Sequence, residues 1–444
     1  MSKGPLALAI LPRGMDGLFM RPVEGIEPFY PVAAGSPEED WARRVFDPER
    51  ILPYRFHGPP VGAFPTTEEI LRQSDLAQVL TRAGVASLLL TATYTPLMKA
   101  WADSHRIRMI APAFALQRRL EDKLWFHRFM RRMGLPCPAG AAVPVQRLAR
   151  VALDRPIVVQ RAQSTGGEGT WFPDDAEGLA RVAAKLDAGE RVLVRERIAG
   201  RPYGIALFVA PDLLALSPLR LQCYLPAEGL QKVFAGIQWI PDGELPQALR
   251  SACNRTFRRL GAELRRRRFF GFANVDFMVD ARGRIYLLEC NPRMSAATAQ
   301  LLGRPELLPG LDAWGRFLRG FLGRRPSPKR FRFHPMPPSA FAGSTLDVAF
   351  LPGKHAEAYA MPRTFPSGTY RFDRDRVHFE RPDARAAGGP ERMFVFAPVP
   401  SGRVLREETT LALILSNLRL YDADGALTAA GKRLLHHFGP RLTR

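Results

Sequence analysis

The sequence lacks the features of membrane-embedded and disulfide-stabilised proteins. No apolar run approaches the roughly 18 residues that a membrane-spanning helix needs. The four cysteines lie far apart, in neither a metal-ligand spacing nor a disulfide framework, so a reducing cytoplasm is the expected setting. The 8 histidines are scattered, and no Ser/His/Asp or Cys/His arrangement can be singled out. The opening stretch has no cleavage-site pattern, so residues 6–11 are expected to form a buried strand and not a signal peptide.

Acidic residues are outnumbered by basic ones. The chain carries 64 Lys and Arg against 43 Asp and Glu, which gives a net charge of +21. A field of this sign favours anionic partners of any kind, but it carries no information about the fold. Genome composition is the alternative cause, since usage is rich in arginine, alanine and proline.

The length of 444 residues predicts about three domains. Near the N-terminus, apolar runs such as 6–11 and 86–90 alternate with helical patterns, which indicates an open α/β sheet. Thr66 and Glu69 have the spacing of a capping box at the start of a helix. No Gly-x-Gly-x-x-Gly follows the first strand, so a dinucleotide site is not supported.

One stretch about two-thirds of the way along the chain has the most informative pattern. Two runs alternate apolar and polar side chains with the period of a β-strand. Between them, Arg282-Gly283 is expected to be the two-residue loop of a hairpin. With that loop, Asp276 faces Glu289, and Asn274 faces Asn291.

These facing pairs would place oxygen ligands together. Cross-strand neighbours lie about 4.5–5.5 Å apart at Cβ, so Asp276, Glu289 and Asn291 would converge on one or two small cations. Hard oxygen ligands without His or Cys suit Mg²⁺. Pro292 ends the second strand, and the guanidinium of Arg293 is suited to an anionic phosphate. A plain hairpin with its acids in solvent is the alternative.

Asp276, followed by the run Glu289-Cys290-Asn291-Pro292-Arg293, resembles the metal-binding end of the ATP-grasp superfamily. That superfamily includes biotin carboxylase, carbamoyl phosphate synthetase and carboxylate–amine ligases. The resemblance implies that Asp276, Glu289 and Asn291 hold two Mg²⁺ ions on the phosphates of ATP, with Mn²⁺ as an alternative metal. It also implies that Arg293 is catalytic and neutralises an acyl phosphate.

Two further segments resemble nucleotide-binding parts of the same family. Residues 114–133 are predicted to form one helix, and Lys123 in it corresponds to a lysine that reaches the nucleotide phosphates. Glu196, Arg197 and Ile198 follow a predicted strand and resemble the hinge that holds the adenine. The carboxylate of Glu196 would accept from the adenine amine. A strand that simply ends in a turn is the alternative.

A strand that leads into a glycine-rich loop lies between these segments. Gly166, Gly167 and Gly169 allow backbone N–H groups to approach phosphate oxygens closely, and they resemble the family's phosphate-covering loop. Gln160 stands where the family commonly has a lysine, so a hydrogen-bond donor remains but a positive charge beside the phosphates is lost. Arg161 or the helix lysine is expected to compensate for the missing charge.

Further elements are predicted from periodicity. The predicted strands are 191–195, 203–208, 213–221, 370–379 and 393–397, and the predicted helices are 174–186, 246–268, 406–418 and 428–438. The last hundred residues could complete the grasp domain or form a small α+β appendage.

The resemblance implies an α/β protein with a Rossmann-like domain over residues 1–113. An ATP-grasp domain would follow over 114–325, with a phosphate-covering lid at about 135–195, and a small C-terminal α+β extension over 326–444. The implied activity is that of an ATP-dependent ligase, which activates a carboxylate as an acyl phosphate and joins it to an amine, releasing ADP and phosphate.

Two other activities remain open. One is an ATP-dependent carboxylase, although no biotin-carrier or glutaminase segment is recognisable. The other is a basic nucleotide- or nucleic-acid-binding protein without ligase chemistry. The expected partners are a small carboxylate and an amine, either anionic or borne on an acidic carrier protein. A homodimer is compatible with the family, whereas membrane and nucleic-acid partners are not expected.

Overall fold

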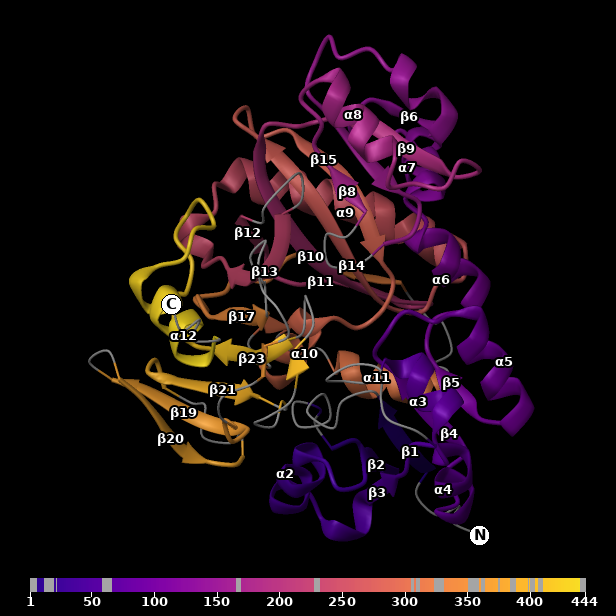
Figure 1. The fold of residues 1–444 in the computed structure, drawn as a ribbon, viewed down its shortest axis with the longest axis vertical. Coiled ribbons are helices and arrows are strands. Elements are labelled where there is room, and N and C mark those ends of the chain that lie inside the picture. Colours follow the sequence, from indigo (N-terminus) through magenta and orange to yellow (C-terminus); the bar gives the residue numbers. More distant parts are fainter. Residues whose placement is uncertain are drawn as a thin grey trace.

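A computed structural model describes most of the chain. The residues described are 6–11, 20, 22–57, 66–164, 169–226, 232–304, 307–308, 312–322, 331–349, 359–360, 364–373, 376–383, 389–397, 399, 404–405 and 410–439. Figure 1 shows a small sheet with its helices at each end of the molecule and a large sheet between them.

The N-terminal sheet is parallel and five-stranded. Its order is β3 (Ile51–Tyr54), β2 (Ile26–Ala33), β1 (Leu6–Leu11), β4 (Ser87–Leu90) and β5 (Arg108–Ile110). Its helices are α2 (Pro37–Val45), α3 (Thr67–Gln73), α4 (Leu76–Arg82) and α5 (Pro96–His105). The predicted capping box of Thr66 and Glu69 begins α3. Strand order reverses direction at β1, which is the arrangement of doubly wound, Rossmann-like sheets.

A four-stranded antiparallel sheet forms the opposite end of the molecule. Its order is β6 (Gly140–Pro144), β9 (Arg191–Glu196), β7 (Ile157–Arg161) and β8 (Thr170–Trp171), with α8 (Ala176–Ala183) beside it. This small unit, called the lid here, has a core of its own that includes Val159, Trp171, Leu179 and Val194. A separate core lets the lid pack as one piece over the large sheet.

The large sheet contains twelve strands among the described residues. Its path is β15 (Ile285–Asn291), β14 (Gly271–Asp280), β10 (Gly200–Ala210), β12 (Arg220–Pro226), β13 (Lys232–Trp239), β17 (Ser344–Ala349), β23 (Thr410–Ser416), β21 (Arg392–Phe396), β19 (Gly368–Asp373) and β20 (Arg376–Arg381). Off this path, β11 (Leu213–Leu216) pairs with β10 and with β16 (Arg332–His334). A separate pair is formed by β18 (Tyr359–Ala360) and β22 (Val404–Leu405).

Helices cover the large sheet. They are α6 (Phe114–Glu121), α7 (Lys123–Arg132), α9 (Gln247–Arg266), α10 (Ala296–Gly303), α11 (Ala313–Phe321) and α12 (Ala429–Phe438). The helix predicted over 246–268 is α9, and its apolar face is buried, with Phe257, Leu260 and Leu264 all in the main core. Gly261 lies against Leu214 of β11, so close that a Cβ there would be 2.5 Å from its side chain. This contact brings α9 tightly onto β11.

Four predicted elements are wrong in detail. The predicted strand 370–379 is two antiparallel strands, β19 and β20, with 374–375 outside the described residues. Residues 114–133 form two helices, because Asp122 leaves the helical conformation and caps α7. The predicted strand 213–221 is interrupted at Ser217-Pro218, between β11 and β12. The predicted helix 406–418 contains β23 instead, with 406–409 outside the described residues. β23 is buried along most of its length, and an apolar run of that kind cannot be told from a buried helix by periodicity.

The C-terminal strands continue the large sheet. β17 pairs with β13, and β23, β21, β19 and β20 follow outward in turn. Of the two alternatives left open by the sequence, this topology fits completion of the grasp domain. Figure 1 shows these strands, in orange and yellow, beside β13 and away from the lid.

Candidate functional site

The hairpin of β14 and β15 has the register that the sequence predicts. Asp276 lies opposite Glu289, and Asn274 lies opposite Asn291. β14 also pairs along its whole length with β10, so the hairpin is held in the large sheet and does not stand free. The two predicted pairs are therefore confirmed as neighbours on a supported surface.

The loop that closes this hairpin has three residues, 281–283, and not the predicted two. Gly283 takes the positive φ of 74° that such a loop requires at its end. A second one-residue shift occurs between Asp276 and Phe277, where a bulge sets two residues of β15 against one of β14. The two shifts cancel, and for this reason the predicted facing pairs are correct although the loop is not.

The bulge is stabilised by an arginine that sequence reasoning missed. Leu288 is the extra residue of β15, and its carbonyl accepts a hydrogen bond from Nη1 of Arg195 at 3.0 Å. Arg195 lies on β9 of the lid and is only 4% exposed. Burial lowers the pKa of its guanidinium to about 10, while the charge of Glu289 acts in the opposite direction. One buried cation thus joins the lid to the hairpin.

Lys123 is the first residue of α7 and lies between the same two parts. Asp122 caps the helix by accepting from the amide of Trp125 at 2.8 Å, which turns Lys123 inward. The Nζ atom of Lys123 is 3.1 Å from Oε2 of Glu289 and donates to the carbonyl of Ser164 at 3.0 Å. The lysine therefore connects the hairpin with the residue that precedes the glycine-rich loop.

A cavity of about 540 Å³ lies between the lid and the hairpin. Of the predicted site residues, it is lined by Lys123, Gln160, Glu196, Arg197, Ile198, Asp276 and Glu289. Asn291 and Arg293 are not among its lining residues. Gly166 and Gly167 lie outside the described residues, and Gly169 turns the chain back toward β8 with a φ of 64°. The structure thus brings seven of the predicted residues to one cavity.

Part of the cavity lining, called the apolar slot here, is made of apolar side chains. Val158, Phe172, Met278 and Leu288 line it together with Ile198. These side chains come from both the lid and the large sheet, so both parts contribute to the apolar slot. Such a slot suits a flat aromatic ring, with a few polar groups at its edge.

Two backbone amides of the hinge already donate hydrogen bonds within the protein. The amide of Arg197 donates to the carbonyl of Pro156 at 2.9 Å, and that of Glu196 donates to Ala139 at 2.8 Å. The guanidinium of Arg197 lies over the ring of Phe172, 5.1 Å from its centroid. The amide of Arg197 is therefore unavailable to read a ring edge, and that role is left to the neighbouring peptide groups.

Gln160 occupies the cavity, and the expected compensation by Arg161 does not occur. Nε2 of Gln160 donates to Oγ1 of Thr170 at 3.1 Å, while its Oε1 is buried and makes no hydrogen bond within the described part of the chain. Arg161 points elsewhere and pairs with Glu190 at 3.4 Å. Arg195, one strand away, supplies the cavity with the positive charge that Gln160 lacks.

The two carboxylates of the hairpin have opposite pKa shifts. Burial, reinforced by the charge of Glu289, raises the pKa of Asp276 to about 7. Burial acts in the same direction on Glu289, but the charge and hydrogen bond of Lys123 outweigh it and lower the pKa of that carboxyl. Asn291 donates from Nδ2 to Oδ2 of Asp276 at 3.2 Å. Lys123 makes the direct ion pair with Glu289, while the charges of Arg195 and Arg220 act on Glu289 and Asp276 without an ion pair.

This donor set fits Mg²⁺. Two carboxylates and an amide are hard oxygen ligands, which is the ligand type that Mg²⁺ prefers. In the described part of the chain, no cluster of three or more His, Cys, Asp or Glu is placed so that it could hold a metal ion by itself. Burial and the charge of Glu289 raise the pKa of Asp276, and a divalent ion bound beside it would favour the charged carboxylate.

β12 contributes two polar residues that were not predicted. Gln222 donates to Oδ1 of Asp276, and Arg220 donates from Nη2 to Oδ1 of Asn274 at 3.1 Å. Arg220 is 2% exposed. Gly204 on β10 makes room for both, since a Cβ there would be 2.8 Å from Nε2 of Gln222. The alternation Arg220-Leu221-Gln222 was the available signal, because it marks one polar face of a strand.

Arg293 lies just beyond the carboxylates, at the end of β15. Its Nε is 3.2 Å from Oε1 of Glu121, and its Nη2 donates to Oδ1 of Asn291 at 3.5 Å. Burial raises the pKa of Glu121, although Arg293 acts to lower it. Arg293 also lines a small hollow that includes Leu90 and Ile110, the last residues of β4 and β5. The guanidinium therefore lies between the hairpin and the N-terminal sheet.

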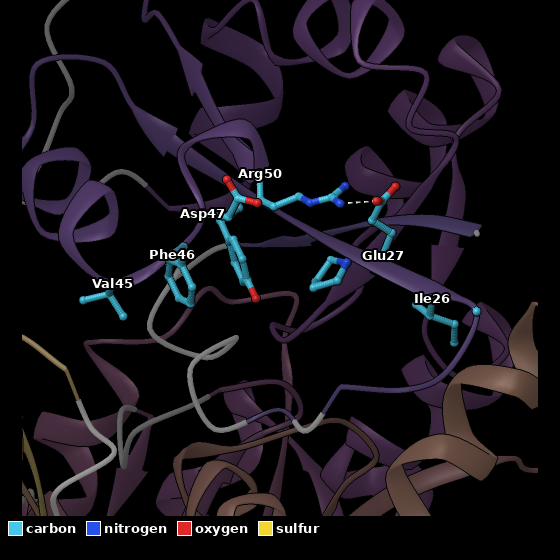
Figure 2. A pocket seen from close by; sticks show the side chains of 9 residues that line it. Ile26, Glu27, Val45, Phe46, Asp47 and Arg50 are labelled. Atoms are coloured by element: carbon cyan, nitrogen blue, oxygen red, sulfur yellow. Dashed lines mark ion pairs between the residues drawn. The ribbon is translucent and has the colours of Figure 1, made fainter. Parts of the chain in front are cut away.

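A separate hollow of about 440 Å³ lies on the N-terminal sheet. Figure 2 shows Arg50 and Glu27 pointing toward one another across it, with Phe46 and Val45 to one side. It contains no predicted site residue, so it does not belong to the site described above.

No helix among the described residues is both long enough and apolar enough to cross a membrane.

Comparison with known proteins agrees with this geometry. A family model described as an ATP-grasp domain matches residues 120–297. The carbamoyl phosphate synthase large chain of Archaeoglobus fulgidus is 26% identical over 269 residues, which cover 57% of this chain and 24% of that protein. The D-alanine–D-alanine ligase of Ectopseudomonas mendocina is 27% identical over 204 residues, covering 43% of this chain and 61% of the ligase. The chain thus spans less than two-thirds of these relatives.

Solved structures share the fold over nearly the whole chain. The biotin carboxylase domain of Hydrogenobacter thermophilus 2-oxoglutarate carboxylase, solved as a dimer with MgADP and bicarbonate, superposes with a TM-score of 0.64. The superposition covers 94% of this chain and 87% of that one at 13% identity. The chain therefore carries an ATP-grasp domain, which spans residues 120–297.

Proposed function

We propose that the protein is an ATP-dependent ligase that activates a carboxylate as an acyl phosphate and joins it to an amine. The observation that carries this proposal is the cavity between lid and hairpin, whose lining combines apolar side chains with Lys123, Asp276 and Glu289. A protein that only binds a nucleotide does not need two carboxylates at the phosphate end, whereas phosphoryl transfer does.

In this proposal the adenine lies in the apolar slot and the triphosphate extends toward Lys123. Arg195 adds a second buried cation beside the phosphates, in place of the lysine that Gln160 replaces. Asp276, Glu289 and Asn291 would hold one or two Mg²⁺ or Mn²⁺ ions, which neutralise phosphate charge when bound. The glycine-rich segment at 166–169 would cover the phosphates and exclude water.

Arg293 is proposed to stabilise the acyl phosphate. Its guanidinium is fixed by Glu121 and Asn291 at the boundary with the N-terminal sheet. That position is next to the carboxyl ends of β4 and β5, where open α/β sheets usually bind ligands. We therefore place the carboxylate and amine substrates between the hairpin and the N-terminal sheet.

The setting of the enzyme is also a proposal. All four cysteines are free thiols, which suits a reducing cytoplasm. A homodimer is proposed because the biotin carboxylase domain that shares the fold was solved as a dimer. An acidic carrier protein that bears the second substrate is consistent with the net charge of +21. The domain limits 1–113, 114–325 and 326–444 stay predictions.

A substrate screen tests the activity. Purified protein is incubated with ATP and Mg²⁺ and with pools of amino acids and carboxylic acids, and the release of ADP and phosphate is measured. Mass spectrometry then identifies any amide formed. ADP release that depends on both a carboxylate and an amine is expected, and an Asp276→Ala protein is the inactive reference. ATP binding without ADP release under any pool would contradict the ligase assignment.

A further inference from the structure

The outer side of α7 carries a second, cationic hollow. It has a volume of about 320 Å³ and is lined by Arg119, Trp125, Arg128, Phe129, Arg132, Met133 and Arg267. These residues come from α6, from α7 and from the C-terminal end of α9. None of them lines the cavity between lid and hairpin. The hollow, called the arginine groove here, is thus a separate feature of the surface.

The four arginines of the groove are exposed, and none makes an ion pair with a residue that the structure describes. Exposed arginines elsewhere do find partners: Arg43 pairs with Glu39, and Arg181 with Glu177, in each case one helical turn away. Several cations around one hollow repel each other unless an anion lies between them. The groove therefore has positive charge that no nearby carboxylate of the described residues compensates, unlike the paired arginines of α2 and α8.

Helix dipoles explain only part of this arrangement. Cations are favoured at helix C-termini, and Arg119, Arg132 and Arg267 lie at or near the ends of their helices. Arg128 lies in the middle of α7, where the helix dipole does not stabilise a cation. Helix dipoles also do not explain why arginines from α6, α7 and the end of α9 line the same hollow.

The aromatic floor of the groove is already covered. Trp125 and Phe129 stack with their ring centroids 5.2 Å apart, and the guanidinium of Arg267 lies 5.0 Å from the centroid of Phe129 and 5.7 Å from that of Trp125. Cation–π contact holds this guanidinium in place. Single-stranded nucleic acids bind by stacking bases on free aromatic faces, and these faces are occupied. The groove is consequently built for anionic groups and not for bases.

We propose that the arginine groove is a binding site for a pyrophosphate-containing ligand, distinct from the nucleotide cavity. Guanidinium forks bind phosphate oxygens with two parallel hydrogen bonds. A di- or triphosphate concentrates three or four negative charges in a few atoms, which matches four arginines around 320 Å³. An acidic peptide carries one charge per residue, so matching charge would need more chain than the hollow holds. The ligand is a nucleoside polyphosphate or an inorganic one, since both present the same group.

The experiment is a calorimetric titration of Mg²⁺-free tripolyphosphate into the full-length protein. Arg128→Ala/Arg132→Ala is expected to weaken binding about tenfold or more, because each lost charged hydrogen bond costs that order of affinity. Arg72→Ala/Arg82→Ala is the matched control, with the same loss of charge on exposed helix surface outside the groove. It should bind as wild type does. A Lys123→Ala protein should also retain binding, which separates the groove from the nucleotide cavity.

Three outcomes would overturn the proposal. Equal weakening in both double variants would mean that the overall positive charge of the protein, and not the groove, attracts the tripolyphosphate. Loss of binding in Lys123→Ala alone would place the probe in the nucleotide cavity. Tighter binding of an oligoglutamate or a single-stranded RNA, with the same dependence on Arg128 and Arg132, would assign the groove to a macromolecule. Repeating the titration with ATP in the wild type and in Arg128→Ala/Arg132→Ala separates the two phosphate sources. Only the part of the ATP affinity that depends on Arg128 and Arg132 belongs to the groove, and a nucleoside that contributes there would make this part exceed that for tripolyphosphate. None of these measurements needs ligase activity.

Discussion

Asp276 and Glu289 lie side by side, but only Glu289 has a cation in contact. Nζ of Lys123 is 3.1 Å from Glu289, whereas Asp276 accepts from the neutral amides of Gln222 and Asn291. Burial of the unpaired carboxylate is unfavourable for the fold. Unfavourable burial of a charged group is common at functional sites, because a bound ligand or ion then compensates the charge.

We therefore expect Asp276→Asn to stabilise the metal-free protein while abolishing ADP formation. The pKa of Asp276 is raised above its unfolded value, so its ionisation destabilises the fold increasingly from about pH 4 to pH 7. Removing that charge should raise the free energy of unfolding by about 1–3 kcal/mol at pH 8, and by little at pH 4. Thermal unfolding at the two pH values, with an ADP assay, measures both effects.

Asp280→Asn is the control for that variant, because Asp280 lies at the hairpin turn and its side chain bonds only within the hairpin, to Arg282, Arg284 and Tyr286. It should keep activity and gain no stability. An active Asp276→Asn protein would remove this carboxylate from the metal site. Glu289→Ala and Asn291→Ala should also be inactive but folded, and activity that fell only in proportion to lost folding would contradict the site.

A second prediction at this scale concerns the cations of the cavity. Lys123→Ala should weaken ATP binding about tenfold or more, since a charged hydrogen bond contributes about 1.5–3 kcal/mol. Gln160→Lys should keep or tighten binding, because it restores a charge in the cavity. Lys185→Ala, an exposed lysine of the lid, is the control and should have no effect. Unchanged affinity in Lys123→Ala would show that this lysine does not contact the nucleotide.

At the scale of elements, the break between α6 and α7 positions Lys123. A single helix through 114–133 would keep Lys123 in mid-helix, whereas Asp122 ends one helix and begins the next at the cavity wall. The cap is one side-chain hydrogen bond, from the amide of Trp125 to Oδ1 of Asp122. The position of a functional residue thus depends on a capping residue beside it.

Asp122→Ala should consequently affect both stability and nucleotide affinity. Loss of an N-cap costs about 1 kcal/mol. Asp175→Ala removes the equivalent cap of α8, where Oδ1 accepts from the amide of Gly178. Both variants should melt at similarly lower temperatures, but only Asp122→Ala should weaken ATP binding. Equal ATP affinity in the two, measured by calorimetry, would contradict a positioning role for Asp122.

At the scale of the whole molecule, the C-terminal strands and the grasp domain share one core. β13 pairs with β17, and Tyr421 is fully buried with its hydroxyl donating to the carbonyl of Ala235 at 2.8 Å. Trp239 at the end of β13 is buried as well and bonds to Gln300 at 2.7 Å. The sheet cannot be cut after β13 without exposing this core.

A chain of residues 1–325 should therefore fail to fold as a stable unit. The cut leaves the edge of β13 unpaired and its apolar side chains exposed, which promotes aggregation. Expression, gel filtration and thermal unfolding of the truncated chain test this. A soluble monomer with a cooperative transition and full ATP affinity would show instead that residues 326–444 form an independent appendage.

The net charge of +21 leads to a prediction about the second substrate. If that substrate or its carrier is anionic, its apparent KM should rise with salt, because electrostatic steering is screened beyond about 8–10 Å. The step inside the covered cavity should change little. KCl titration from low to physiological strength measures this for each substrate found. A neutral substrate that is turned over fastest, with a salt-independent KM, would attribute the charge to genome composition.

The hairpin and its facing pairs could be predicted from the sequence by itself, because a period of two assigns each side chain to a face. The same holds for β4, for the capped helix α3 and for the amphipathic helices α9 and α12, whose patterns are complete within a few turns. The identity of the carboxylates followed from local order, and it survived an error in the loop because a bulge restored the register.

Only the tertiary structure decided which distant residues meet at the site. Arg220 and Gln222 reach their hairpin partners across 54 positions of sequence, and Arg195 reaches Leu288 across 93. No local pattern encodes such contacts, because they depend on which strands become neighbours in the sheet. β23 shows the same limit, since its apolar run is compatible with a buried helix until β17 and β21 pair with it on either side.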